Sequence, residues 1–96
     1  MISENPLRHV RIIVYGKVQG VFFRKHTFQK ANELGIKGFV KNQEDKSVMI
    51  EAVGNNVSLN FFIDWCKKGP SRANVTGVEI IELSNINEFS DFSILK

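Results

Sequence analysis

The order in which strand-like and helix-like patterns alternate is the feature that most constrains the fold of this chain. The run at residues 10–15, VRIIVY, is rich in β-branched residues and ends at Gly16, so it predicts a strand. The next stripe recurs at helical spacing and precedes Gly35, a residue type that commonly ends helices. We therefore expect a first helix over about residues 22–34. The stripe consists of Phe23, Thr27, Ala31 and Leu34.

A pair of strands and a second helix follow. Residues 36–42 (IKGFVKN) and 48–53 (VMIEAV) alternate as strands do, and the polar stretch between them predicts a hairpin. Asn55 or Asn56 then caps a helix that runs to about residue 68, ahead of a Gly-Pro pair that stops it. The apolar stripe of this helix is Leu59, Phe62, Ile63 and Cys66.

The last third of the chain supplies the remaining strands. After a loop at 71–76, residues 77–83 (GVEIIEL) predict a fourth main strand and residues 92–95 (FSIL) a short closing strand. The order β-α-β-β-α-β matches the ferredoxin-like split βαβ motif. We therefore expect an α+β fold with two helices on one face of an antiparallel sheet. Since 96 residues suit one domain, we assign residues 1–8 to a flexible N-terminal tail and residues 9–96 to the folded domain.

Composition indicates where the protein is located more clearly than it indicates what the protein does. Hydrophobic residues make up 43% of the chain, which is too apolar for disorder and ordinary for a soluble domain. A net charge of +3 favours anionic partners without choosing among phosphorylated metabolites, nucleic acid and membrane surfaces. Cys66 has no second cysteine to pair with, the polar N-terminus lacks the apolar segment of a signal peptide, and no run of about 18 apolar residues occurs. We expect a cytoplasmic monomer with no membrane contact.

The loop at residues 16–21, GKVQGV, joins the first strand to the first helix, an arrangement that suits anion binding. The first N–H groups of a helix have no partner within the helix, and glycines let successive amides curve around an oxyanion. The spacing fits neither a nucleotide P-loop nor a dinucleotide fingerprint, and by itself it also suits an ordinary turn. Arg24 favours the anion, because a cation in the first helical turn opposes the helix dipole unless a phosphate lies between them.

Residues 14–24, VYGKVQGVFFR, closely resemble the first signature of the acylphosphatase family. Residues 38–42, GFVKN, resemble the second, which continues through residues 48–54 at the expected spacing. The similarity extends to residues 68–70 and 92–94, so it covers nearly the whole chain after the tail. The resemblance implies hydrolysis of the carboxyl–phosphate bond of small-molecule acyl phosphates, giving a carboxylate and inorganic phosphate, without a metal or cofactor.

The resemblance also implies a role for each matching position. Arg24 would bind the substrate phosphate together with the loop amides, and Asn42 would position the attacking water. The phosphate-binding set is Gly16, Lys17, Val18, Gln19, Gly20, Val21, Phe22, Phe23 and Arg24. One departure concerns the hairpin, where the family has a glycine and this chain has Lys46. We therefore expect Asp45 or Lys46 to adopt a left-handed conformation there.

Alternative functions share some of these patterns. RNA-recognition motifs have the same element order, and an estimated pI of 9.2 suits RNA, but the strand at 48–53 carries no stacking aromatic residue. A domain that has lost catalysis could still bind carboxyl-phosphate or carbamoyl-phosphate groups. Because both Arg24 and Asn42 are present, the sequence gives that alternative no support.

The remaining reactive side chains predict structural roles. His9 and His26 are expected on the surface, and Cys66 is expected to pack as a small hydrophobic residue. No cluster of His and Cys has the spacing of a metal site. The aromatic residues that fall off the helical stripes are expected at the edge of the core, namely Phe28, Phe61 and Trp65.

Overall fold

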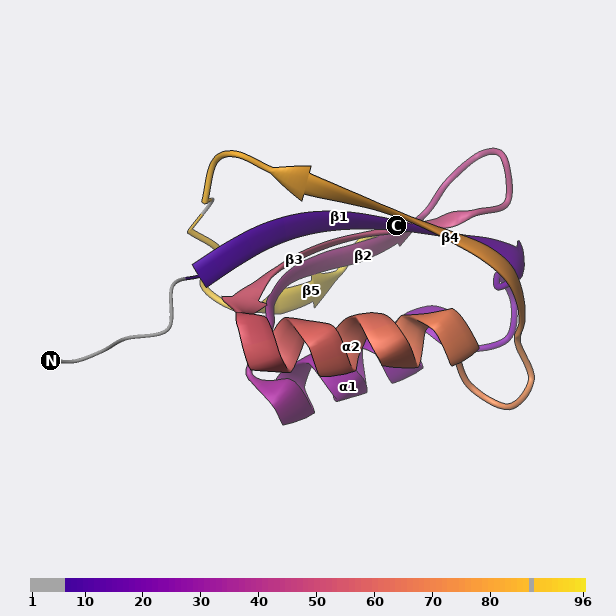
Figure 1. Ribbon diagram of the computed structural model, residues 1–96. Helices are drawn as coiled ribbons and strands as arrows, with labels where there is room; N and C mark the ends of the chain where they lie inside the picture. The colour runs from indigo at the N-terminus through magenta and orange to yellow at the C-terminus, as the bar shows by residue number, and fades with distance from the viewer. Residues whose placement is uncertain (1–6, 87) are drawn as a thin grey trace, which may run out of the picture.

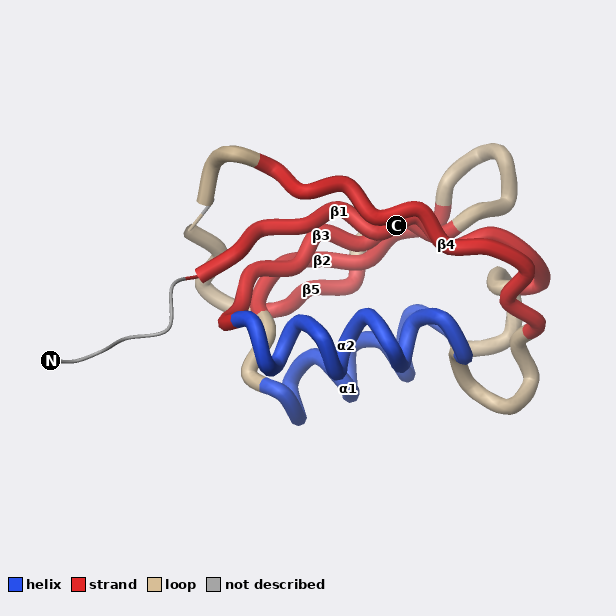
Figure 2. The backbone as a smooth tube through the Cα atoms, in the orientation of Figure 1, coloured by secondary structure: helices blue, strands red, loops and turns tan. Residues whose placement is uncertain are grey.

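The computed structural model describes residues 7–86 and 88–96, and in this part of the chain two helices pack on a five-stranded sheet. The strand order is β4-β1-β3-β2-β5, and Figures 1 and 2 show both helices on the same face of the sheet. The predicted ferredoxin-like α+β fold is confirmed. The elements are β1 (Leu7–Lys17), α1 (Phe23–Leu34), β2 (Lys37–Asn42), β3 (Val48–Asn55), α2 (Asn56–Lys68), β4 (Asn74–Leu83) and β5 (Phe92–Ile94).

The sheet is mixed, so the prediction of a purely antiparallel sheet is wrong at one edge. β1 pairs antiparallel with β3 and β4, and β2 pairs antiparallel with β3. β5 runs parallel to β2, with Gly38 opposite Phe92 and Val40 opposite Ile94. The reason is the connection after β4, which crosses to the other edge at the end of the sheet where β2 begins. β5 therefore starts beside the start of β2 and follows its direction.

Two strands are longer than their sequence patterns predict. β1 begins at Leu7, which pairs with Asn55 of β3, so the assignment of residues 7 and 8 to a flexible tail is wrong. β4 begins at Asn74, which pairs with Lys17, so the predicted loop at 71–76 is too long. Polar residues at these strand ends carry no apolar alternation, and partners distant in sequence hold them in the sheet. Residues 1–6 of the predicted tail lie outside the described residues.

The core lies between the helices and the inner face of the sheet. The predicted stripes of both helices face it, except that Leu34 is only half-buried. Each fully buried aliphatic side chain stabilises the fold by about 1.5–3 kcal/mol. Because this burial requires contact between the helices and the sheet, it holds the helices on that face. Asn55 caps α2 as predicted, its side-chain oxygen accepting from the Ser58 amide at 2.9 Å. The strand residues facing the helices include Val10, Ile12, Val14, Val40, Val48, Ile50 and Ala52.

The other structural predictions for single side chains have mixed outcomes. Cys66 is buried in the core, and burial raises the pKa of its thiol. Phe28 and Trp65 are half-buried against the core, and His26 is exposed, as expected. The prediction for Phe61 is wrong, because its side chain is 62% exposed on the face of α2 that points away from the sheet.

Candidate active site

The predicted site residues come together at one end of the sheet. β1 ends there and leads into the loop before α1, while β2 ends there and turns through the hairpin into β3. The strand register places Val48 of β3 between Val14 of β1 and Asn42 of β2. The loop and the hairpin therefore leave the same end of the sheet, although they are separate in sequence (Figure 1).

Two glycines allow the loop to adopt its backbone conformation. Gly16 lies at an irregularity in the pairing of β1 with β4 and has a φ of 120°. A Cβ at this position would lie 2.1 Å from the carbonyl oxygen of Asn74, so only glycine fits. Gly20 has a φ of 75°, a left-handed conformation that side chains disfavour. Phe22 follows with a φ of 61° and occupies the N-cap position of α1, where its ring cannot accept a hydrogen bond from the helix.

Arg24 and Asn42 line the same cleft, of about 320 Å³, together with the loop. Of the predicted phosphate-binding residues, Val18, Gly20, Phe22, Phe23 and Arg24 line it, whereas Gly16, Lys17, Gln19 and Val21 do not. The side chains of Val18, Val21 and Phe23 are buried in the core. These three residues can therefore offer a ligand only their backbone groups. The full lining is Val18, Gly20, Phe22, Phe23, Arg24, Lys25, Asn42 and Ile94.

Arg24 is held in the cleft by the segment that follows β5. Its Nη1 donates to the carbonyl oxygen of Leu95 at 2.9 Å, and the Leu95 amide donates to the Val40 carbonyl at 2.8 Å. The guanidinium is therefore linked through Leu95 to β2, while its other N–H groups stay available for an oxyanion. Leu95 is a site residue that the sequence reasoning missed, because a backbone acceptor leaves no signature in the side chain.

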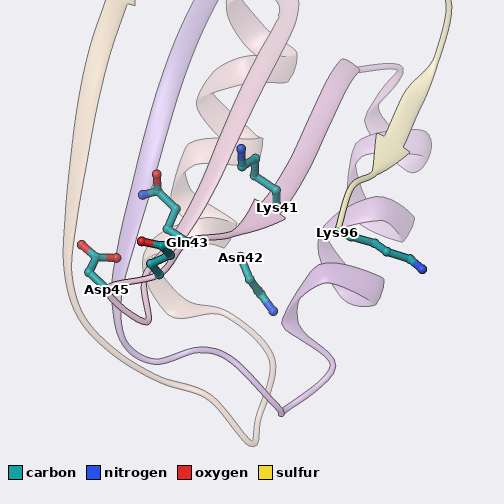
Figure 3. Close-up of a pocket in the computed structure, with 6 residues that line it drawn as sticks. Lys41, Asn42, Gln43, Asp45 and Lys96 are labelled. Atoms are coloured by element: carbon teal, nitrogen blue, oxygen red, sulfur yellow. The ribbon is translucent and has the colours of Figure 1, made fainter.

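Asn42 ends β2, and its side chain extends from the strand end toward the loop before α1, while Lys41 points the other way (Figure 3). Its Oδ1 is buried and accepts no hydrogen bond from any residue that the structure describes. A buried acceptor without a donor costs about 1–3 kcal/mol, and such groups are rare outside functional sites. The amide of Asn42 is therefore poised to interact with a ligand or a water molecule.

Gln19 ties the loop to the hairpin that carries Asn42. Its Nε2 donates to the carbonyl oxygen of Gln43 at 2.8 Å and to that of Ser47 at 2.9 Å. The prediction assigned phosphate binding to the loop amides, and these side-chain hydrogen bonds leave that role of the Gln19 amide untested. The two halves of the site are thus joined by hydrogen bonds that fix the loop relative to the strand end.

The hairpin contains the strained residue that the sequence predicts. Lys46 has a φ of 80°, at the position where the family pattern has glycine. Asp45 compensates in part, because its Oδ1 accepts from the hydroxyl of Ser47 and from the Ser47 amide at 3.0 Å. These hydrogen bonds, the hydroxyl first, lower the pKa of the Asp45 carboxyl.

A second hollow, of about 510 Å³, adjoins the hairpin (Figure 3). It shares Asn42 with the cleft but is not lined by Arg24 or by the loop before α1. Its lining is Lys41, Asn42, Gln43, Glu44, Asp45 and Lys96. Within residues 7–86 and 88–96, no group of three or more His, Cys, Asp or Glu side chains could hold a metal ion. In the same part of the chain, neither helix is long and apolar enough to cross a membrane.

Comparison with known proteins shows the family of the chain. The acylphosphatase family model matches residues 10–94. The chain belongs to the acylphosphatase family. It is 38% identical to an acylphosphatase of Methylococcus capsulatus over 94% of this chain and 98% of that protein. Its structure is similar to acylphosphatases from Coxiella burnetii (TM-score 0.89, 36% identity, 95% of this chain and 94% of that one) and Bacillus subtilis (TM-score 0.90, 35% identity, 95% and 100%).

Membership of the acylphosphatase family identifies the chain as a hydrolase. The family acts on small-molecule acyl phosphates. The RNA-binding alternative shares with this chain an element order and a basic pI, but the family is that of an acyl phosphate hydrolase.

A separate polar cluster of this acylphosphatase-family chain lies on the outer face of the sheet. His9 is 2% exposed, so its predicted surface position is wrong. Its Nε2 lies 2.9 Å from Oε1 of Glu51, and its Nδ1 lies 2.8 Å from the carbonyl oxygen of Asn85. Arg11 donates to the other carboxylate oxygen of Glu51 at 2.7 Å. The connection between β4 and β5 buries the imidazole, with the Phe89 ring 5.8 Å from it. The cluster lies near the start of β1 and is not part of the cleft.

Proposed function

We propose that this chain hydrolyses the carboxyl–phosphate bond of acyl phosphates in the cleft between the loop and β2. The observation that carries the proposal is the meeting of Arg24, Asn42 and the loop around one cleft. Each of these three parts has a distinct chemical task, and together they meet the needs of phosphoryl transfer, which are charge stabilisation and in-line positioning.

The phosphoryl group is bound by Arg24 and by the backbone amides between residues 17 and 23. A guanidinium holds two phosphate oxygens in a fixed fork. The amides at the start of α1 add the positive end of the helix dipole, since the Phe22 side chain leaves them uncapped. Both groups stabilise the charge that collects on the equatorial oxygens in the transition state.

Asn42 orients the attacking water. A carboxamide is too weak a base to remove a proton, but its buried Oδ1 can accept a hydrogen bond from water and aim the water oxygen at phosphorus. The new bond forms between the water oxygen and phosphorus while the bond from phosphorus to the acyl oxygen breaks. The carboxylate leaves with the bonding electrons, and a phosphate oxygen of the substrate takes the proton of the water. A carboxylate is a good leaving group, so positioning worth several kcal/mol replaces a strong base.

We infer that the chain acts as a monomer in the cytoplasm. The free and buried Cys66 fits a reducing compartment.

The test is release of inorganic phosphate from acetyl phosphate and benzoyl phosphate, with EDTA present. We expect turnover by the wild-type chain and a loss of kcat/KM of about 10²–10³-fold in both Arg24→Ala and Asn42→Ala, the magnitude typical of one lost transition-state contact. Arg72→Ala and Asn60→Ala, which change the same residue types at exposed positions, should retain wild-type activity. If the wild type hydrolyses neither substrate but binds inorganic phosphate, the chain is a binding module instead.

A further inference from the structure

The lining of the cleft combines polar and apolar side chains. Arg24 and Asn42 form a polar side, while Phe22 and Ile94 contribute large apolar side chains to the same cleft. Phe22 is 65% exposed and Ile94 is 43% exposed. Scattered exposed apolar residues are ordinary on a protein surface, but these two come from different parts of the chain and lie beside the proposed phosphate site.

The position of Phe22 is not explained by folding. Its backbone has a φ of 61° and a ψ of 24°, a left-handed conformation that aromatic residues rarely adopt. It occupies the N-cap of α1, where Ser, Thr, Asp or Asn would satisfy a helix amide and phenylalanine cannot. Its ring is mostly outside the core. Strained residues of this kind are concentrated at ligand-binding sites, which points to a role for the exposed ring.

We propose that Phe22 and Ile94 bind the acyl group and that this chain favours acyl phosphates with apolar, aromatic or branched acyl groups. The proposal rests on the proposed function. An acyl group is bonded through one oxygen to the phosphorus, so a phosphoryl group held by Arg24 and the loop amides places the acyl group along the walls of the same cleft. A benzoyl ring is large enough to pack against the Phe22 ring, whereas an acetyl group buries little apolar surface there.

Lys25 also lines the cleft. Its ammonium group could attract an acyl group that carries its own carboxylate, which is the alternative substrate class. Lys25 is exposed, and an exposed ammonium is strongly hydrated and gives a screened, weak attraction. Phe22 directly precedes α1 and Ile94 ends β5, so ordered backbone positions both apolar side chains. We therefore assign selectivity to Phe22 and Ile94.

The chain offers a matched control for each residue. Phe61 of α2 is 62% exposed and Ile80 of β4 is 40% exposed, close to the values for Phe22 and Ile94, but neither lines the cleft. Phe22→Asn removes the ring while keeping a residue that tolerates the left-handed conformation. Ile94→Thr removes apolar surface while keeping a β-branched residue in the strand. Phe61→Asn and Ile80→Thr make the same chemical changes away from the cleft.

The readout is the ratio of kcat/KM for benzoyl phosphate to that for acetyl phosphate, expressed relative to wild type so that the intrinsic reactivities of the substrates cancel. We expect the ratio to fall about fivefold in Phe22→Asn and Ile94→Thr, as suits the loss of one apolar or aromatic contact, and to stay within about twofold in the controls. An unchanged ratio in Phe22→Asn, with both substrates still hydrolysed, would overturn the inference alone. A wild-type preference for an acyl phosphate with a carboxylated acyl group would also overturn it.

A binding measurement separates this inference from the proposed function. Phenylphosphonate carries an aromatic group and methylphosphonate a small aliphatic group, each on a carbon–phosphorus bond that is not hydrolysed. The proposal predicts tighter binding of phenylphosphonate to wild type, and a loss of that difference in Phe22→Asn. Equal binding of the two phosphonates to wild type would refute the role of Phe22 and Ile94 in binding the acyl group, whatever the outcome of the hydrolysis assay.

Discussion

Replacing Glu51 by glutamine should destabilise the fold much more than the same change at a surface ion pair. The Glu51 side chain is 9% exposed, and its carboxylate interacts with His9 at 2.9 Å and with Arg11 at 2.7 Å. Removing one partner of a buried pair costs about 3–5 kcal/mol, because the other charge is left uncompensated. The Arg11 side chain is 39% exposed, so water replaces part of the lost interaction. We therefore expect a loss of about 2–4 kcal/mol in the free energy of unfolding, about 1 kcal/mol less than for a fully buried pair.

Equilibrium unfolding in urea, followed by the fluorescence of Trp65, measures this loss. For a chain of this size, the expected change lowers Tm by roughly 10–25 °C. Glu82→Gln is the control, because Glu82 pairs with Arg8 at 2.9 Å but has a side chain that is 54% exposed. Breaking that pair should cost about 1 kcal/mol or less. If both variants lose the same free energy at unchanged m-values, the reasoning from burial is wrong.

Three smaller changes test the hairpin and the core. Lys46→Gly removes a lysine that has a left-handed backbone conformation. The free energy of unfolding should rise by about 0.5–1 kcal/mol, after the greater entropy of glycine in the unfolded state is deducted. A decrease would show that Lys46 is not strained. Asp45 has a lowered pKa in the folded state, so its contribution to stability is present above the unfolded pKa and is lost as pH falls through the folded pKa. Ser47→Ala should move the pKa of Asp45 upward in an NMR titration, and no movement would show that the hydroxyl is not the cause. Burial raises the pKa of the Cys66 thiol, so a disulfide reagent should modify it only as the chain unfolds; rapid reaction in the native state would contradict its burial.

The sequence predicted the helices and central strands well, because their periodicity reports which side chains are buried. The stripe of α2 is an example, since all of its apolar positions face the sheet. The start of β1 was missed because Arg8 and His9 are polar. These residues are held by partners far along the chain, Glu82 for Arg8 and Glu51 for His9. Burial of a charged side chain depends on such partners, and no local pattern reveals them.

The direction of β5 was missed for a related reason. Its residues have strand propensity, but propensity does not say which edge of the sheet a short strand joins. That choice depends on where the preceding connection leaves β4 and on the free edge of β2. Both are properties of the assembled sheet.

The candidate site was predictable where side chains carry the chemistry. Arg24 and Asn42 stand in motifs, and the structure places both in one cleft. The hydrogen bonds from Arg24 to the Leu95 carbonyl and from Gln19 to the hairpin were not predictable. Each has a backbone carbonyl as its acceptor, and only folding brings that carbonyl close to the side chain. The exposed apolar side chains of Phe22 and Ile94 in the cleft were missed as well.

The most direct test of the central claim separates phosphate binding from turnover. Inorganic phosphate is the product of the proposed reaction. If the proposed roles hold, its competitive inhibition constant reports on phosphate binding by Arg24 and the loop, and kcat reports on the orientation of the attacking water by Asn42. We predict that Asn42→Ala is inhibited by phosphate as strongly as wild type but loses at least about 100-fold in kcat, and that Arg24→Ala no longer binds phosphate at comparable concentrations. Equal loss of phosphate inhibition in both variants, or full phosphate binding by Arg24→Ala, would contradict the account.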